Sequence, residues 1–160
     1  MPDLEWFVRD DLVQIAADRG VAVAQFKGVP EPSAYAAYRR ALDAAVAHSG
    51  ARAVAVHLAR PSQAKADRTR MNAELSQMLR DYDQKLGAVG FVILGEGFLN
   101  AMLRSMAWLG ITTVRPKTPI KIFYDPKLAS AFAAGAAGRE ERDVWDVVSQ
   151  FQSEVGQSPH

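Results

Sequence analysis

Few residues of this chain have the type and placement for catalysis. His57 lies in a predicted strand, and an imidazole titrates near neutral pH, as a general base must. A base also needs a nucleophile or a second titratable group beside it, yet the sequence contains no Gly-x-Ser-x-Gly elbow and no cysteine. We therefore interpret His57 as a structural strand residue and predict that the chain is not an enzyme.

Two glycines come directly after the most apolar stretch of the chain. Gly95 and Gly97 open a predicted helix, as the phosphate-binding loop of a dinucleotide site does. The third glycine of that motif is replaced by Asn100. We interpret the pair as the end of a strand and predict no cofactor. The sequence also lacks the ligand spacing of a metal site.

A group of methionines with one tryptophan is the best candidate for a ligand pocket. Methionine adapts to irregular apolar shapes, so these residues predict a soft apolar pocket, and the alternative is ordinary core packing. They lie on two predicted helices, over residues 71–86 and 98–109. The group consists of Met71, Met78, Met102, Met106 and Trp108.

Composition restricts the class of protein. The length of 160 residues, with 49% hydrophobic and 23% charged residues, fits one folded domain. The formal net charge of +1 provides no global field for nucleic acid or an anionic membrane, although a localised patch stays open, and we predict no nucleic-acid partner. The N-terminus lacks the pattern of a signal peptide, and no apolar run reaches the roughly 18 residues of a spanning helix. We expect a cytoplasmic protein without a transmembrane segment.

An apolar run at residues 88–94 organises the predicted fold, because such a run is typical of a strand buried on both faces. Residues 12–17 and 21–27 predict a hairpin around Gly20. Residues 52–58 form a strand with one small-residue face, and residues 120–124 form an edge strand. Residues 4–8 are either a first strand or an arm. We predict an α/β domain with a mixed sheet of about five strands layered with helices.

Helices alternate with these strands. Apolar residues at three- and four-residue spacing predict helices from Ser33 to Gly50 and over 71–86 and 98–109. Asp125 and Pro126 suit the start of a helix over 127–134. A glycine-containing joint at residues 135–138 then leads into a last helix from 139, with a tail at 157–160.

This order of elements resembles the STAS domain, the fold of SpoIIAA-like anti-sigma-factor antagonists, over about residues 12–134 within a unit of 1–138. The segment Ile120-Lys-Ile-Phe-Tyr-Asp-Pro-Lys-Leu-Ala-Ser-Ala-Phe132 resembles the final strand and helix of that family. Pro61, Arg68 and Met71, with Ala107-Trp108, resemble a STAS/SEC14-like subset. The resemblance implies a non-enzymatic module that binds a regulatory protein partner or, in SEC14-like relatives, an apolar ligand.

One departure from the family concerns its phosphorylated turn. Anti-sigma antagonists carry an Asp-Ser-Ser/Thr-Gly type turn after the strand that matches residues 52–58, and this chain lacks its acidic residue and glycine. The residues present are Ser62, Lys65, Arg68, Thr69 and Arg70. A phosphate on either hydroxyl would lie near a helix N-terminus among cations, which is favourable. The alternative is a solvated loop with ordinary helix-start residues.

The C-terminal helix over residues 139–156 lies outside the resemblance. Its apolar residues are too many to stay in water, since each buried Val or Phe side chain is worth roughly 1.5–3 kcal/mol. The glycine joint either folds the helix onto its own sheet or extends it to a second subunit. Because a narrow stripe suits a helix–helix seam, we predict a homodimer. The stripe consists of Val144, Trp145, Val148, Phe151 and Val155.

Two functions stay open from the sequence. The first is a regulatory protein-interaction module whose surface is the loop and helix around residues 62–71. The second is a SEC14-like carrier or sensor, in which the helices over 71–86 and 98–109 lift off the sheet to admit an apolar small molecule or lipid.

Overall fold

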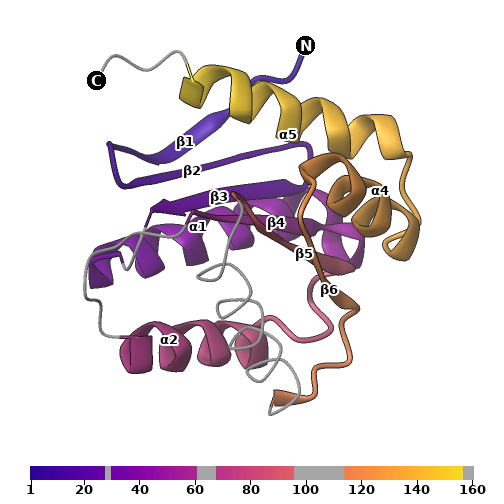
Figure 1. The fold of residues 1–160 in the computed structure, drawn as a ribbon. Helices are drawn as coiled ribbons and strands as arrows, with labels where there is room; N and C mark the ends of the chain where they lie inside the picture. The colour runs from indigo at the N-terminus through magenta and orange to yellow at the C-terminus, as the bar shows by residue number, and fades with distance from the viewer. Residues whose placement is uncertain (28–29, 61–67, 96–113, 157–160) are drawn as a thin grey trace.

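The computed structural model describes residues 1–27, 30–60, 68–95 and 114–156, which form a six-stranded mixed sheet between layers of helices (Figure 1). The strands follow one another across the sheet in chain order. The first three are antiparallel neighbours, and the last four run parallel. The strands are β1 (Glu5–Arg9), β2 (Val13–Asp18), β3 (Val21–Lys27), β4 (Val54–Arg60), β5 (Ala88–Ile93) and β6 (Ile120–Phe123).

The α/β class and the mixed sheet are confirmed, but the expected number of strands is too low. Residues 5–9 form a strand that pairs with β2, so the sheet has six strands rather than about five. The apolar run forms β5, which is buried throughout and lies between β4 and β6. The position of β6 at the edge of the sheet is also confirmed.

The β2–β3 hairpin depends on Gly20. The two residues of its turn, Arg19 and Gly20, have φ angles of 51° and 76°, as a type I′ turn requires. A Cβ atom at Gly20 would lie 1.9 Å from the Ser49 hydroxyl oxygen at the end of the first helix. The glycine therefore permits both the tight turn and the close approach of the helix.

The helices lie on both faces of the sheet. Two of them, α1 and α2, pack on one face, and α4 and α5 cover the other (Figure 1). A 3₁₀ turn, η1 (Gly50–Arg52), leads from α1 into β4. The helices are α1 (Pro32–Ser49), α2 (Arg68–Asp81), α4 (Pro126–Ala136) and α5 (Glu141–Gly156).

The helix boundaries differ in part from the expected ones. Ser33 is not the N-cap of α1: Glu31 takes that position and Pro32 follows inside the helix, where the missing N–H of proline costs nothing. The expected cap at Asp125 is confirmed, because its carboxylate accepts a hydrogen bond from the Lys127 amide at 2.9 Å. The helix predicted to reach residue 86 ends at Asp81 and continues as turns.

The two faces of the sheet carry different side chains. On β4, Val54, Val56 and Leu58 point toward α4 and α5, as the alternation predicted. The opposite face has small residues, because Ala24 of β3 and Ala55 of β4 lie there beside other alanines. Small side chains on the floor leave room for the large aromatic residues of α1 above them.

The C-terminal helix folds back onto its own sheet, which is one of the two expected outcomes. Its apolar stripe is buried against β2 and β3, and Trp6 of β1 stacks on Phe151 with ring centroids 5.5 Å apart. Trp145 and Val155 are half-buried beside the same core. The fully buried residues are Val144, Val147, Val148 and Phe151.

The stripe therefore needs no second subunit to cover it, and the predicted homodimer no longer rests on these residues. The joint also differs from the expected hinge, since Gly135 lies inside α4 and Gly138, at φ 68°, makes the turn into α5.

Candidate functional site

A small cavity of about 30 Å³ lies between α1, α2 and the alanine-rich face of the sheet. Side chains from α1, α2, β4 and β5 contribute to its wall, together with the segment just before β6 and the start of β6 itself. The wall includes Tyr38, Ala55, His57, Met78, Tyr82 and Phe91.

Helix α2 stands farther from the sheet than the other helices do. Its backbone makes few close approaches to the other described elements, whereas α1 and α4 lie directly on strands (Figure 1). Long side chains bridge the distance: Met78 is buried, and Met71, Leu75 and Leu79 are partly buried against the same core. The cavity lies among these side chains and the alanine-rich face of the sheet.

The polar atoms of the wall residues are bonded to one another or to groups outside the cavity. The Tyr82 hydroxyl donates to the Asp43 carboxylate at 2.7 Å and lies 3.1 Å from the Arg39 carbonyl oxygen. The Thr118 hydroxyl donates to the Leu86 carbonyl oxygen and accepts from the Gln84 amide. None of the described residues that line the cavity is charged. Such a cavity offers no hydrogen bond to water and suits an apolar guest.

His57 forms part of the cavity floor and is buried, with 3% of its surface exposed. Its ring stacks on Tyr38 with centroids 5.5 Å apart, and its Nδ1 atom lies 3.3 Å from the Tyr38 hydroxyl. The rings of Phe26 and Phe91 pack around it. Burial lowers the pKa of His57 from 6.5 to about 4 and raises that of Tyr38, so both are neutral at pH 7.

The C-terminal end of α2 is tied to two neighbouring segments. Asp81 forms an ion pair of 2.6 Å with Arg39 of α1, and this hydrogen-bonded pairing lowers the pKa of Asp81. The Asp83 carboxylate accepts hydrogen bonds from the amides of Thr118 at 2.9 Å and Lys117 at 2.8 Å, which lower its pKa. Together with the Tyr82–Asp43 bond, these contacts make this end the fixed end of the helix.

Tyr35 contributes an unusual group to the layer between α1 and α2. Its hydroxyl is buried and has no hydrogen-bond partner among the residues that the structure describes. Burial raises the pKa of Tyr35 to about 12, and the charge of Glu74 on α2 adds to this effect. An unpaired buried hydroxyl costs free energy, so this layer is not optimised for stability.

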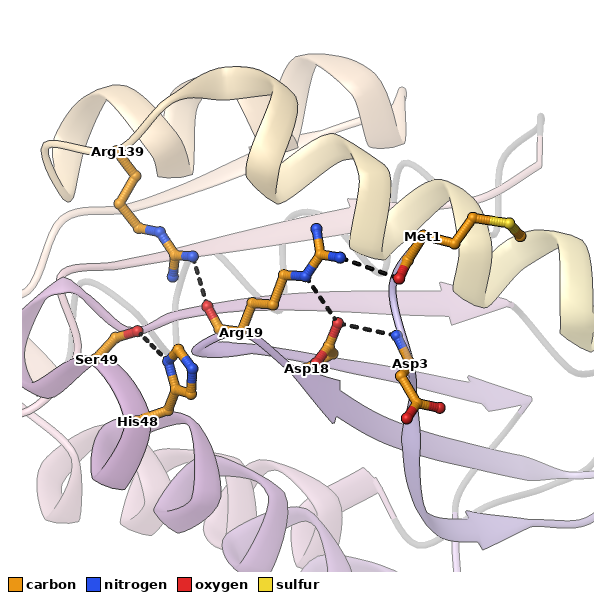
Figure 2. Close-up of polar contacts among 7 residues, drawn as sticks. All are labelled: Met1, Asp3, Asp18, Arg19, His48, Ser49 and Arg139. Carbon is orange, nitrogen blue, oxygen red and sulfur yellow. Dashed lines mark hydrogen bonds and ion pairs between the residues drawn. The ribbon is translucent and has the colours of Figure 1, made fainter.

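A second polar cluster joins the segment just before α5 to the β2–β3 turn, at the amino ends of the parallel strands (Figure 2). Arg139 donates hydrogen bonds to the carbonyl oxygens of Arg19 at 2.5 Å and Gly20 at 3.1 Å. Arg52 donates to the Gly138 carbonyl oxygen. The adjoining open groove is lined by charges of both signs, with Glu140 beside these arginines, so it favours no particular ligand charge. We interpret the cluster as a structural clasp.

The structure brings together only part of each predicted residue set. Met78 lines the cavity and Met71 packs beside the same core, whereas Met102, Met106 and Trp108 lie outside the described residues. Ser62 and Lys65 also lie outside them. Arg68, Thr69 and Arg70 form the first turn of α2, and Arg70 is exposed.

The wall residues that the sequence did not single out are mainly aromatic. Tyr38 and Tyr82 belong to apolar stripes that predicted the two helices, but nothing in their spacing shows that they meet across one cavity. The bond from Tyr82 to Asp43 joins residues 39 positions apart in the sequence, and no sequence signal reveals it.

Comparison with known proteins yields no match: no protein-family model, no curated protein and no solved structure is significantly similar to this chain. Within the described ranges, no group of three or more histidine and acidic residues is arranged to hold a metal ion. No helix in those ranges is long and apolar enough to cross a membrane.

Proposed function

We propose that this chain is a non-enzymatic carrier or sensor that binds an uncharged, apolar small molecule beneath α2. The observation that carries the proposal is the uncharged cavity, whose polar wall residues have their hydroxyl groups bonded elsewhere. A charged ligand would lack a counter-charge there, and a strongly polar one would lose its hydrogen bonds to water. The ligand class is therefore hydrocarbon-like, in line with the SEC14-like resemblance of the sequence.

Binding requires α2 to move. The cavity measures about 30 Å³, whereas an apolar cavity that accepts benzene measures roughly 150 Å³. The fixed C-terminal end of α2 and the long side chains along the rest of the helix favour an outward swing that enlarges the space.

Native mass spectrometry of freshly purified protein tests the proposal, together with titration of the neutral dye N-phenyl-1-naphthylamine. We expect a co-purifying apolar mass or saturable dye fluorescence. The substitution Ala55→Val fills the cavity from its floor and should abolish both signals. Ala36→Val, on the exposed side of α1, is the matched control and should bind as the parent does. A clean apo mass without dye binding would overturn the proposal.

A second function, a regulatory protein-interaction module, is favoured by the start of α2. The helix begins at Arg68, shortly after the carboxyl end of β4, which puts Thr69 in its first turn, where a phosphate is electrostatically favoured. Ligand-driven movement of α2 would change this surface, so both functions fit one protein. With a purified partner, Thr69→Asp should change affinity and Thr69→Ala should not, while both melt within about 2–4 °C of the parent. Equal affinities would contradict this function.

A further inference from the structure

We propose that His57 is a proton-sensitive gate of this cavity, so that acidification speeds the exchange of ligand without first weakening its equilibrium binding. The inference rests on the proposed function and concerns the regulation of the same site. It depends on where His57 lies, what surrounds it, and which end of α2 is anchored.

Among the described residues of the cavity wall, no opposite charge lies beside His57, and its Nδ1 atom has a neutral partner, the Tyr38 hydroxyl. Helix α1 contributes the Tyr38 ring, β3 contributes Phe26 and β5 contributes Phe91. The residues of α2 that line the same cavity are Leu75, Met78 and Leu79.

The titratable groups on the cavity wall, among the residues described, are the imidazole and the phenols of Tyr38 and Tyr82. Burial is the main cause that raises the pKa of both phenols, so they stay neutral under acid. The carboxylate bonded to a wall residue, Asp43, is exposed and engaged by Tyr82. An imidazolium in the closed cavity therefore has no counter-charge among these groups.

Opening of α2 relieves this cost because water then reaches the floor. In the closed protein the pKa of His57 is about 4, and a hydrated histidine titrates near 6.5. As the pH falls between these values, the ratio of open to closed protein rises by up to tenfold for each pH unit, which gives a rise of about 20-fold from pH 7 to pH 5.

The fixed end of α2 survives this change. The pKa values of Asp81 and Asp83 are lowered by their hydrogen bonds, so both anchors remain ionised at pH 5. Acidification therefore does not release the C-terminal anchors, and the movement that we propose involves the half of α2 that bears Met71 and Leu75.

The kinetic signature separates a gate from a loss of affinity. In the bound protein the ligand fills the enlarged cavity and keeps water from His57, so the pKa of His57 stays lowered there. Ligand enters and leaves through the water-filled open state, so a larger open population raises both rates in proportion. The dissociation constant changes little until the open form becomes a large share of the free protein.

The test measures release of N-phenyl-1-naphthylamine by stopped-flow competition at pH 7, 6 and 5 and constant ionic strength. The parent protein should release dye about 20-fold faster at pH 5 than at pH 7. His57→Gln and His57→Phe should remove this dependence, and the second variant keeps the test valid if the first fails to fold. His48→Gln changes an exposed histidine and should behave as the parent does.

A measurement without ligand separates failure of the gate from failure of the proposed function. Methyl relaxation dispersion of Met71 should report an open population that grows on acidification in the parent and stays constant in His57→Gln. An unchanged population overturns the gate whether or not dye binds. Dye binding with a pH-independent release rate also overturns it, whereas absence of dye binding contradicts the proposed function and leaves the dispersion result to decide on the gate.

Discussion

The hydroxyl of Tyr82 donates a 2.7 Å hydrogen bond to the carboxylate of Asp43 and so joins the turn after α2 to α1. Tyr35 lies in the same layer between the two helices, yet its hydroxyl has no partner among the described residues. Two phenols in one layer therefore differ in what their hydroxyl groups contribute. The Tyr82 hydroxyl helps to hold α2 in place, whereas burial of the Tyr35 hydroxyl lowers the stability of the fold.

This contrast predicts opposite effects of one chemical change. Tyr82→Phe removes a hydrogen bond to a charged group and should lower the free energy of unfolding by about 1–2 kcal/mol. Tyr35→Phe removes an unsatisfied buried hydroxyl and should leave stability unchanged or raise it. Urea denaturation of both variants and the parent checks the pair. A larger loss in Tyr35→Phe than in Tyr82→Phe would refute the assignment.

The buried imidazole predicts how stability depends on pH. The pKa of His57 is about 4 in the folded protein and about 6.5 when unfolded, so the unfolded state binds more protons between these values. The free energy of unfolding should therefore fall as the pH decreases from 6.5, by about 3 kcal/mol in total at pH 4. His57→Gln should lose this contribution and His48→Gln should keep it, as chemical denaturation across this range will show.

Two glycines predict opposite responses to alanine. A Cβ atom at Gly90 would lie 3.1 Å from the Ala129 Cβ, so α4 must shift, and Gly90→Ala should cost about 1–3 kcal/mol. A Cβ atom at Gly135 meets nothing within 4 Å on the exposed side of α4, so Gly135→Ala should stabilise the protein by about 0.5–1 kcal/mol. The melting temperatures of both variants and of the parent protein test this prediction. A destabilised Gly135→Ala variant would show that this residue acts as a hinge after all.

The role of α5 predicts the cost of removing its largest side chain. Phe151→Ala leaves a cavity beneath the helix and exposes the face of Trp6, so we expect a loss of about 3–5 kcal/mol. Ser153→Ala, on the exposed side, is the control and should change stability by less than about 0.5 kcal/mol. A Phe151 variant as stable as the parent would contradict this packing.

The homodimer stays a prediction that needs its own measurement. The stripe that suggested it is buried within the subunit, so sedimentation of the full chain at tens of micromolar tests the sequence prediction independently of these residues. A monomer at this concentration would disprove the dimer.

The sequence predicted best those features that depend on local pattern. The apolar run of β5, the alternation along β4 and the Asp125 cap each follow from neighbours within a few residues, and the structure confirms them. The strand at residues 5–9 was left open because a short aromatic segment pairs or lies free according to partners far along the chain. Glu31 displaced Ser33 as the cap because the position of Pro32 outweighed the preference for serine.

The candidate site was less predictable for the same reason. Met78 was identified because methionine on an apolar stripe is visible in the sequence, but the wall also needs Tyr38, Phe91 and Tyr82, which come from three separate elements. The burial that lowers the pKa of His57 arises from these long-range neighbours. The sequence alone placed His57 in a strand, but it did not predict that the pKa of this residue is lowered.

The clasp between Arg139 and the β2–β3 turn has a consequence for synthesis on the ribosome. Helix α5 follows every strand of the sheet in the chain, so a nascent chain that has completed β6 still exposes the valine face that α5 covers. Such an exposed apolar face is prone to aggregation until α5 has been synthesised and covers it. Because Arg139 lies just before α5 and binds the earlier turn, it can direct the helix to its place as soon as it emerges, and its loss should reduce soluble yield more than equilibrium stability.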